Sequence, residues 1–216
     1  MAISTGSKII KTAVFISGTG SNLKSLIKFS KLKKSPISIN LIISNNPKSI
    51  GLKYANIFKI KKKIFPLKKI TDEKKILFEL KKEKIDLICL AGFMKILSKN
   101  FIKNFKGKIL NIHPSLLPKF KGLNTHERAI KSGVKFTGCT VHLVRSGVDE
   151  GPIIGQAVTS VDATDDKDSL AEKVLKLEHE LYPKCLKLFT DELVKVKNDK
   201  VIFSEKAIKI LDDFKI

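Results

Sequence analysis

The sequence of 216 residues contains no tryptophan, only two tyrosines and three cysteines, and no long apolar run. Cys89, Cys139 and Cys185 are far apart and form no Cys-x-x-Cys pair. This excludes a disulfide scaffold and a cysteine zinc site, and it favours a reducing, cytoplasmic location. No apolar stretch approaches the roughly 20 residues that a membrane-spanning helix requires. The residues before Ile9 also lack the apolar core of a secretory signal, so we expect no membrane partner.

Arginine is almost absent as well, and this decides how the charge is interpreted. The formal net charge of +21 by itself suggests a nucleic-acid-binding protein. Arg128 and Arg145 are the only arginines, which leaves 40 lysines among the 42 basic residues, spread along the whole chain. A dedicated nucleic-acid binder is expected to use arginine for bidentate recognition and aromatic side chains for base stacking. We therefore expect no specific nucleic-acid partner, and a lysine-rich nucleic-acid-binding protein is kept as the alternative from another class.

The first half of the chain alternates predicted strands and helices, without an internal repeat or a Pro- or Gly-rich linker. Apolar runs predict strands at 9–16, 37–43, 86–91 and 108–112, with a further short strand at 63–66. Helical spacing occupies 23–32, 50–60, 71–80 and 94–105. Such alternation predicts a parallel sheet with right-handed crossovers.

The second half of the chain has a different pattern. An irregular loop at 114–122 precedes a helix at 125–132, and strands at 136–144 and 152–159 follow. A long helix at 168–190, a hairpin at 193–203 and a short amphipathic tail complete the chain. The fold class expected is α/β: a Rossmann-like, mostly parallel twisted sheet with helices on both faces and an antiparallel C-terminal part. We expect one domain over 9–190, with the hairpin and tail at 191–216 packed on it.

Six residues directly after the first predicted strand, Ser17-Gly18-Thr19-Gly20-Ser21-Asn22, could bind a phosphate. Ligands of such sheets bind beyond the carboxyl ends of the strands, where glycines permit close approach and a helix N-terminus presents free N–H groups. The segment lacks both the third glycine of the dinucleotide fingerprint and the Gly-Lys-Ser/Thr of a P-loop. The alternative is an ordinary turn in which Ser21 or Asn22 caps the helix.

Asn111 and His113 lie two residues apart at the end of a predicted strand, so their side chains point to the same side of the sheet. A histidine at that end can act as an acid or stabilise an oxyanion, and the asparagine supplies a neutral N–H donor. The alternative is a histidine that only hydrogen-bonds the loop after it.

Asp149, in the loop at 148–152, is the candidate partner of His113, because a carboxylate beside an imidazole orients the ring and raises its pKa. His142 lies in mid-strand among apolar residues and is expected to be a core histidine. Together with His113 and Asp149 it lacks the tight spacing of metal ligands, so no metal is expected. Glu178, on the long predicted helix, is a candidate for reaching a polar substrate.

In this order and spacing, the segments resemble the folate-dependent formyltransferase family. The stretches that carry the resemblance are FISGTGSNL at 15–23, LAGFMKILS at 90–98, ILNIHPSLLPKFKGLNTHERAI at 109–130, GCTVHLV at 138–144, VDEGPIIGQ at 148–156 and EHELYP at 178–183. The resemblance runs from about Ile9 to about Leu188, and HPSLLP followed by VDEGPII is its most specific feature. It implies the formyltransferase fold.

The resemblance implies an enzyme with small-molecule substrates, a monomer or weak homodimer. It would transfer the formyl group of its cosubstrate 10-formyltetrahydrofolate to the amine of N1-(5-phosphoribosyl)glycinamide in purine biosynthesis. The family's catalytic residues correspond to Asn111, His113 and Asp149. Its substrate-binding residues correspond to Gly20, Ser21, Asn22 and Glu178, and its folate-binding residues to Met94, Lys95, Ile96, Leu97, Asn111, Arg145, Ser146, Gly147 and Val148.

The sequence departs from the family pattern at two positions. Lys95 stands where the folate segment usually carries arginine, which keeps the charge but loses the planar fork. Asn124 stands where a histidine is common, and His126 is the neighbour that could take over its supporting role.

Two enzymes with related chemistry are the alternatives within the family. Methionyl-tRNA formyltransferase would suit the basic charge, but it has a further C-terminal domain and only a short segment follows the long helix here. Formyltetrahydrofolate hydrolase has an additional N-terminal regulatory domain, whereas the first strand is expected to begin near Ile9.

Overall fold

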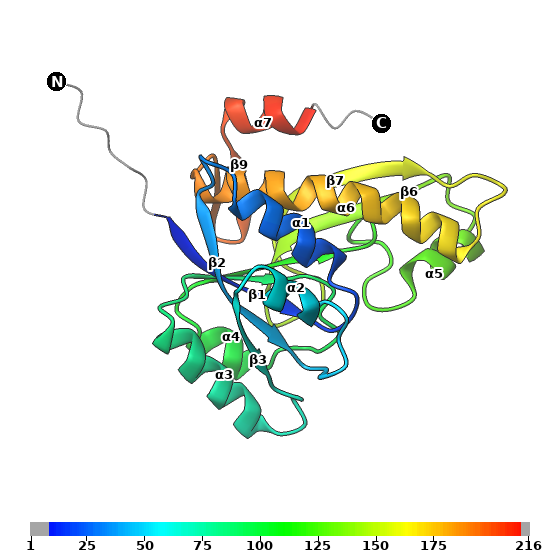
Figure 1. The fold of residues 1–216 in the computed structure, drawn as a ribbon. Helices are drawn as coiled ribbons and strands as arrows, with labels where there is room; N and C mark the ends of the chain where they lie inside the picture. Colours follow the sequence, from blue (N-terminus) through cyan, green and yellow to red (C-terminus); the bar gives the residue numbers. More distant parts are fainter. Residues whose placement is uncertain (1–8, 213–216) are drawn as a thin grey trace.

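The computed structural model describes residues 9–212, which form an α/β fold (Figure 1). The strands are β1 (Ile10–Ile16), β2 (Ile37–Ser44), β3 (Lys61–Ile64), β4 (Leu87–Leu90), β5 (Lys108–His113), β6 (Phe136–Leu143), β7 (Ile153–Ser160), β8 (Val194–Lys197) and β9 (Lys200–Phe203). The helices are α1 (Ser21–Ser30), α2 (Leu52–Ile57), α3 (Ile70–Lys82), α4 (Lys99–Asn104), α5 (Thr125–Lys131), α6 (Lys167–Thr190) and α7 (Glu205–Asp212). The expectations for residues 1–8 and 213–216 lie outside the described residues.

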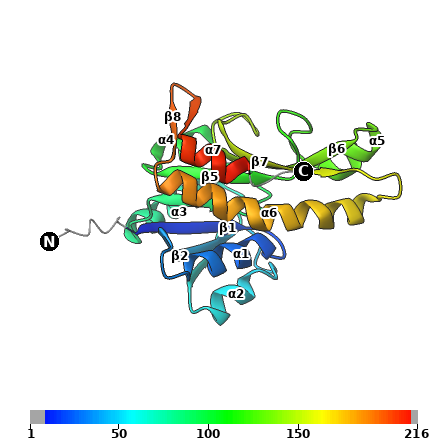
Figure 2. The same cartoon turned by 90° about the horizontal axis from the view of Figure 1, so that it is seen from above.

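Seven strands form one sheet in the order β3-β2-β1-β4-β5-β6-β7. The first five strands of that order pair in parallel, and β6 and β7 are antiparallel to their neighbours. Alternate residues of β1 point to opposite faces: Val14 and Ile16 pack with α1, α2 and α6, whereas Ala13 and Phe15 pack with α3 and α4. Figure 2 shows α1 and α6 running alongside each other. The predicted Rossmann-like fold with helices on both faces is confirmed.

The predicted helix at 94–105 is wrong for its first turn. Gly92 has a left-handed φ of 68° and ends the chain's extended course after β4. The helix α4 begins only at Lys99, because the Ser98 side chain accepts the Phe101 N–H and caps it. Both carboxylate oxygens of Glu73, from α3, accept hydrogen bonds from Ser98, one of them from its backbone N–H at 2.8 Å. Residues 94–97 are therefore an irregular loop on the rim of the sheet.

The strand β3 begins two residues earlier than predicted. Its register pairs Leu41 with Lys61 and Ser44 with Ile64, so the strand is fixed by its partner β2 and not by its own apolar content. It lies at the edge of the sheet, where lysine side chains are tolerated.

The C-terminal segment forms the predicted hairpin, β8 and β9, followed by α7. Val194 of the hairpin and Ala207 of α7 are buried in the apolar cluster that also contains α6. The division into a domain at 9–190 and a C-terminal segment at 191–216 stays a prediction. Among residues 9–212, no helix combines the length and the apolar character needed to cross a membrane.

Candidate active site

The candidate site lies beyond the carboxyl ends of β1, β4 and β5. The sheet order reverses between β1 and β4, which is where open α/β sheets bind their ligands. Two hydrogen bonds join the loops that leave these strands. The Ser17 N–H donates to the Gly92 carbonyl at 3.1 Å, and the Met94 N–H donates to Ser17 Oγ at 2.7 Å.

His113 and Asp149 meet at this edge, although 36 positions separate them in the sequence. Nδ1 of His113, the last residue of β5, lies 3.3 Å from Oδ2 of Asp149. Its Nε2 lies 2.9 Å from the carbonyl oxygen of Phe120. A carbonyl only accepts, so Nε2 carries a proton, and when Nδ1 is also protonated both ring N–H groups have partners. The predicted partnership of His113 with Asp149 is therefore present in the geometry.

His142 is a fourth member of the cluster. It stands opposite Asn111 in the antiparallel pairing of β5 with β6, and its Nε2 lies 3.1 Å from the Asn111 amide nitrogen. Its Nδ1 lies 2.9 Å from the Leu143 carbonyl oxygen, so Nε2 is left to accept the amide hydrogen. Nε2 is also 3.6 Å from Oδ1 of Asp149. Asp149 thus lies between the two histidines, and His142 lies between Asp149 and Asn111.

Asp149 raises the pKa of His113, as expected, but the net pKa of this imidazole is lowered. Burial lowers the pKa of the His113 imidazole, and this outweighs the Phe120 carbonyl and Asp149, both of which raise it. For the carboxyl of Asp149, burial raises the pKa. His142, the Gly122 N–H and His113 outweigh that effect, so the net pKa is lowered. Asp149 is therefore an anion at neutral pH, and His113 readily gives up its second proton.

Two loops hold these side chains in place. Asp149 has a left-handed φ of 52°, and its Oδ2 accepts the N–H of Gly122 at 2.9 Å. In the 114–122 loop, the Leu117 N–H donates to Thr140 Oγ1 at 3.1 Å and the Gln156 amide donates to the Leu117 carbonyl at 3.0 Å. The loop is thus tied to the sheet on one side and to the His113–Asp149 pair on the other.

The turn between β1 and α1 leaves the helix N-terminus open. Gly20 precedes α1 with a φ of 75°, and a Cβ there would lie 2.6 Å from the Gly51 Cα, so only glycine fits. No side chain caps α1. The alternative of a turn capped by Ser21 or Asn22 is therefore wrong, and the first N–H groups of a ten-residue helix are available to an anion.

Asn22 instead reaches Glu178 on α6. Its Nδ2 donates to Oε2 of Glu178 at 2.6 Å, and both residues are buried. Burial raises the pKa of the Glu178 carboxyl to about 7, against the Asn22 hydrogen bond, which lowers it. Oδ1 of Asn22 is buried and has no hydrogen-bond partner among the described residues. An unpaired buried acceptor beside an open helix N-terminus suits a polar ligand.

Comparison with known proteins identifies the family of this chain. The family model described as formyl transferase matches residues 10–186. The chain belongs to the formyl transferase family. The resemblance stated from the sequence is thereby confirmed.

Individual relatives cover this formyl transferase chain to different extents. It is 38% identical to a phosphoribosylglycinamide formyltransferase of Haemophilus influenzae, over 92% of the chain and 95% of that protein. It is 42% identical to the human trifunctional purine biosynthetic protein adenosine-3, over 90% of the chain. The chain spans only 14–20% of the length of that protein and its fly, chicken and bovine counterparts.

Solved structures agree in fold. A phosphoribosylglycinamide formyltransferase from Anaplasma phagocytophilum has a TM-score of 0.86 at 42% identity, covering 92% of this chain and 95% of that one. A formyltetrahydrofolate deformylase from Pseudomonas putida has a TM-score of 0.82 at 27% identity, covering 92% of this chain and 71% of that one.

Apart from Asn111 on β5, the predicted folate-binding residues lie on two loops of this formyl transferase. Met94 and Ile96 are 64% and 75% exposed, Lys95 is exposed, and Leu97 is buried. In the other loop, Val148 is 44% exposed and Ser146 is exposed, while Gly147 and Arg145 are half-buried. The Arg145 guanidinium pairs with Asp199 at the tip of the β8–β9 hairpin at 2.9 Å. The exposed apolar side chains in both loops are available to a ligand.

The supporting role expected of Asn124 or His126 stays a prediction. Asn124 precedes α5 with a left-handed φ of 56° and its side chain makes no cap. His126 is half-buried, and burial together with the nearby His113 lowers its pKa. Its Nδ1 is buried with no hydrogen-bond partner among residues 9–212.

Sequence reasoning missed two residues of the site. His142 was expected to be a core histidine, and only the register of β5 against β6 brings it opposite Asn111. Tyr182 of α6 is fully buried, and its hydroxyl lies 3.2 Å from the Leu90 carbonyl and 3.0 Å from the Leu110 carbonyl. The Tyr182 hydroxyl thus links β4 to β5. The EHELYP segment contained Tyr182, but nothing in it predicted these partners.

Proposed function

We propose that the protein is a phosphoribosylglycinamide formyltransferase. It transfers the formyl group of 10-formyltetrahydrofolate to the amine of N1-(5-phosphoribosyl)glycinamide and releases tetrahydrofolate, a step of purine biosynthesis. The observation that carries the proposal is the cluster of His113, Asp149, His142 and Asn111 at the mouth of the sheet. Relatives of similar length with that name support the choice of substrates.

The reaction needs a donor for an oxyanion and a route for a proton. The substrate amine attacks the formyl carbon and forms a C–N bond, and the formyl oxygen becomes negative. The Asn111 amide has two N–H bonds, of which one goes to His142, so the second is free for that oxygen. The Nε2–H of His113, which now points to the Phe120 carbonyl, turns to donate a second hydrogen bond to the oxyanion.

Asp149 is the base that removes the extra proton from the amine after its attack on the formyl carbon. The ionised carboxylate takes this proton directly or through water, and N10 of the folate receives a proton as its C–N bond breaks. Because Asp149 also lies beside Nδ1 of His113, it orients that ring. The lowered pKa of its carboxyl keeps it ready to accept.

The substrate phosphate is assigned to the open N-terminus of α1, at Gly20, Ser21 and Asn22. Glu178 contacts the remainder of the ribonucleotide, with its carboxyl oriented by Asn22. The folate ring is assigned to the loops that carry Met94–Leu97 and Arg145–Val148, where it is held by apolar side chains and backbone groups.

The cysteines bear on where the protein works in the cell. All three cysteines are free and buried, which suits the reducing conditions of the cytoplasm. We assign the protein to the cytoplasm, as a monomer or weak homodimer. Sedimentation velocity over a range of protein concentrations tests the assembly.

One assay separates this function from its alternatives. Formylglycinamide ribonucleotide formation from 10-formyltetrahydrofolate is measured beside formylmethionyl-tRNA formation and release of formate to water. The proposal expects formylglycinamide ribonucleotide as the dominant product. Formate release as the main reaction would favour the deformylase alternative, to which the Pseudomonas putida structure is relevant. Binding of nucleic acid without any formyl transfer would favour the lysine-rich binding protein.

A further inference from the structure

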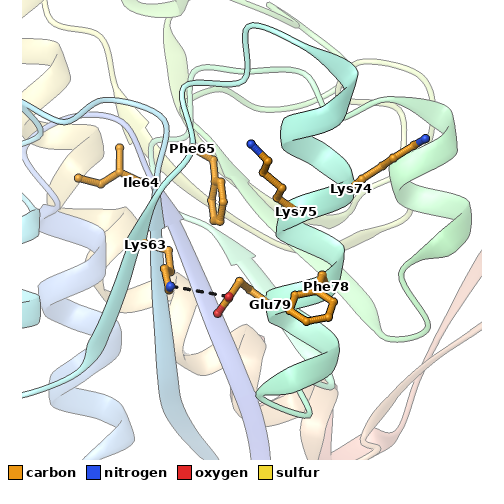
Figure 3. Close-up of a pocket in the computed structure, with 7 residues that line it drawn as sticks. All are labelled: Lys63, Ile64, Phe65, Lys74, Lys75, Phe78 and Glu79. Carbon is orange, nitrogen blue, oxygen red and sulfur yellow. Dashed lines mark ion pairs between the residues drawn. The ribbon is translucent and has the colours of Figure 1, made fainter.

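Two surface cavities lie outside the residues assigned to catalysis and substrate binding. One, of about 530 Å³, lies between β3 and α3 and is drawn in Figure 3. The other, of about 390 Å³, lies between the 114–122 loop and the segment 134–137 that leads into β6. Both volumes fall within the range of small-molecule sites, about 300–1,000 Å³.

The cavity beneath the 114–122 loop, called here the loop cavity, is mainly apolar with basic residues in its wall. Its apolar lining consists of Leu116, Leu117, Pro118, Phe120, Val134 and Phe136. Phe136 is 52% exposed, although it is an aromatic residue in a strand. Lys119 and Lys135 also line the cavity and are exposed. A ligand with an apolar body and one negative group would match both the apolar lining and the two lysines.

A third positive charge lies close to the wall. The Arg128 guanidinium of α5 stacks on the Phe120 ring at 5.6 Å and donates to the Lys121 carbonyl at 2.6 Å. The cavity wall contains no aspartate or glutamate. The β3–α3 cavity is different, because its Lys63 lies 3.7 Å from Glu79, which also lines it (Figure 3). Charge complementarity therefore favours an anion in the loop cavity.

We propose that the loop cavity binds a small amphipathic anion, with an aliphatic or aryl body against Phe136 and a carboxylate or sulfonate at Lys119 and Lys135. None of the side chains assigned to catalysis or substrate binding lines this cavity.

The loop cavity shares its wall with the catalytic loop. Phe120 lines the cavity, and its carbonyl oxygen is the partner of His113 Nε2 at 2.9 Å. The Ser115 hydroxyl donates to the Lys119 carbonyl at 2.7 Å, so two lining residues are tied to the segment that follows His113. An anion that moves Phe120 changes the hydrogen bond of His113. Binding is therefore expected to lower kcat and to leave both KM values unchanged, an effect that rests on the proposed function.

The binding test uses 8-anilinonaphthalene-1-sulfonate, followed by fluorescence, with N-phenyl-1-naphthylamine as the neutral analogue. Phe136→Ser should weaken binding of the sulfonate about tenfold, since it removes apolar contact. Lys135→Glu should weaken it about fivefold, an effect expected of an exposed charge, and should leave the neutral analogue unchanged. Phe78→Ser and Lys74→Glu, in the β3–α3 cavity, are the matched controls and should change either affinity less than twofold.

The outcomes separate the proposal from its alternatives. Equal losses of sulfonate affinity in the loop-cavity variants and in the control variants would mean nonspecific binding to a lysine-rich surface. That result would overturn the proposal, and so would unchanged affinity in all four variants. Circular dichroism shows whether each variant is folded, and the two loop-cavity variants provide independent tests.

Decanoate, added to the formyl-transfer assay, tests the coupling. A fall in kcat that Phe136→Ser abolishes and Phe78→Ser does not would support it. Binding without any change in kcat would overturn the coupling and leave the site standing. Absence of formyl transfer would overturn the proposed function, while the fluorescence titration would still decide the site.

Discussion

Four side chains from β5, β6 and one loop perform complementary tasks in the proposed reaction. Asp149 is placed between two imidazoles, and each imidazole has a second partner, Phe120 for His113 and Asn111 for His142. Such a closed network fixes the tautomers and orientations of its members before the substrates bind. Its members should therefore act as a unit and not as independent contributions.

His113→Ala and Asp149→Asn should each lower kcat about 10²–10⁴-fold. Both changes should leave the KM values nearly unchanged, because these groups act on the transition state. The double variant should cost little more than either single one. Steady-state kinetics check this, with Glu150→Gln, an exposed neighbour paired with Lys121 at 3.0 Å, as the control. Losses that multiply in the double variant would contradict a shared mechanism.

Glu178 is a buried carboxyl, and its titration should affect stability. Burial raises its pKa from 4.5 to about 7 in the folded protein. Between these values the folded state keeps a proton that the unfolded chain has lost, so stability falls as pH rises through this window. Glu178→Gln still accepts from Asn22 but does not titrate. Its free energy of unfolding should exceed that of the unmodified protein by roughly 1–3 kcal/mol at pH 8.

Chemical denaturation of the ligand-free protein at pH 5 and pH 8 measures this difference, which should shrink towards zero at pH 5. Glu180→Gln, on an exposed position of the same helix, should show no such pH dependence. A constant difference at both pH values would mean that Glu178 does not titrate in this range.

At the scale of the elements, the connections after β1 and β4 contribute groups to the candidate site that the strands themselves do not contain. The turn after β1 is closed by Gly20, which approaches Gly51 too closely for any side chain. The loop after β4 ends at Ser98, which both caps α4 and binds the carboxylate of Glu73. Each connection is thereby held at the mouth of the sheet by one residue.

Gly20→Ala should raise the KM for the ribonucleotide more than tenfold and the KM for the folate far less. The new Cβ meets the Gly51 backbone and distorts the helix N-terminus assigned to the phosphate. Gly18→Ala is the matched control, because a Cβ there has no neighbour within 4 Å. Initial-rate kinetics with each substrate varied in turn provide the test. An equal rise in both KM values would indicate general misfolding.

Ser98→Ala should lower the free energy of unfolding by about 1–2 kcal/mol. It removes the α4 cap and leaves a buried carboxylate, Glu73, with one donor fewer. Urea denaturation measures the loss. Ser30→Ala, which removes only a hydroxyl bond to the Ile27 carbonyl at the end of α1, should stay within about 0.5 kcal/mol. Similar losses in the two variants would show that the cap has no special role.

At the scale of the whole molecule, one sheet divides two apolar clusters, and the antiparallel strands extend it beyond the parallel core. The long helix α6 contacts α1, β6 and β7, so it covers both halves of one face. It brings Glu178 to Asn22 at the start of α1, and it brings Tyr182 to β4 and β5. Among residues 9–212, no lysine or arginine is buried, so the basic side chains take no part in this core.

The three thiols report on the integrity of the core. Burial raises the pKa of Cys89 to about 12 and raises the pKa values of Cys139 and Cys185 as well. Because thiolates are the reactive form, the native protein should react with none of the three in Ellman's assay at pH 8. All three should react in denaturant, with a midpoint that matches unfolding followed by circular dichroism. Rapid reaction of a native thiol would show local opening of the core.

The sequence by itself determined the type and order of most elements. Continuous apolar runs such as 87–91 suit strands that are covered on both faces, and Gly-Thr-Gly-Ser-Asn suits a turn into a helix. It also predicted Asn111 and His113 as site residues, because the carboxyl ends of parallel strands meet at one edge of a sheet. Asp149 and Glu178 were predicted as well, because the segments that contain them resemble one family. It failed at 94–98, where the apolar spacing of Met94 and Leu97 imitates a helix.

Only the tertiary structure decided the contacts between segments. His142 is buried as expected, and the register of β5 against β6 also makes it a partner of Asn111. The packing of α6 on α1 joined Asn22 to Glu178 across 156 positions of sequence. The burial of His113 outweighs the effect of Asp149 on its pKa, so the net pKa is lowered. Pattern in a sequence reports local periodicity, whereas register, burial and electrostatic balance arise only when distant segments pack together.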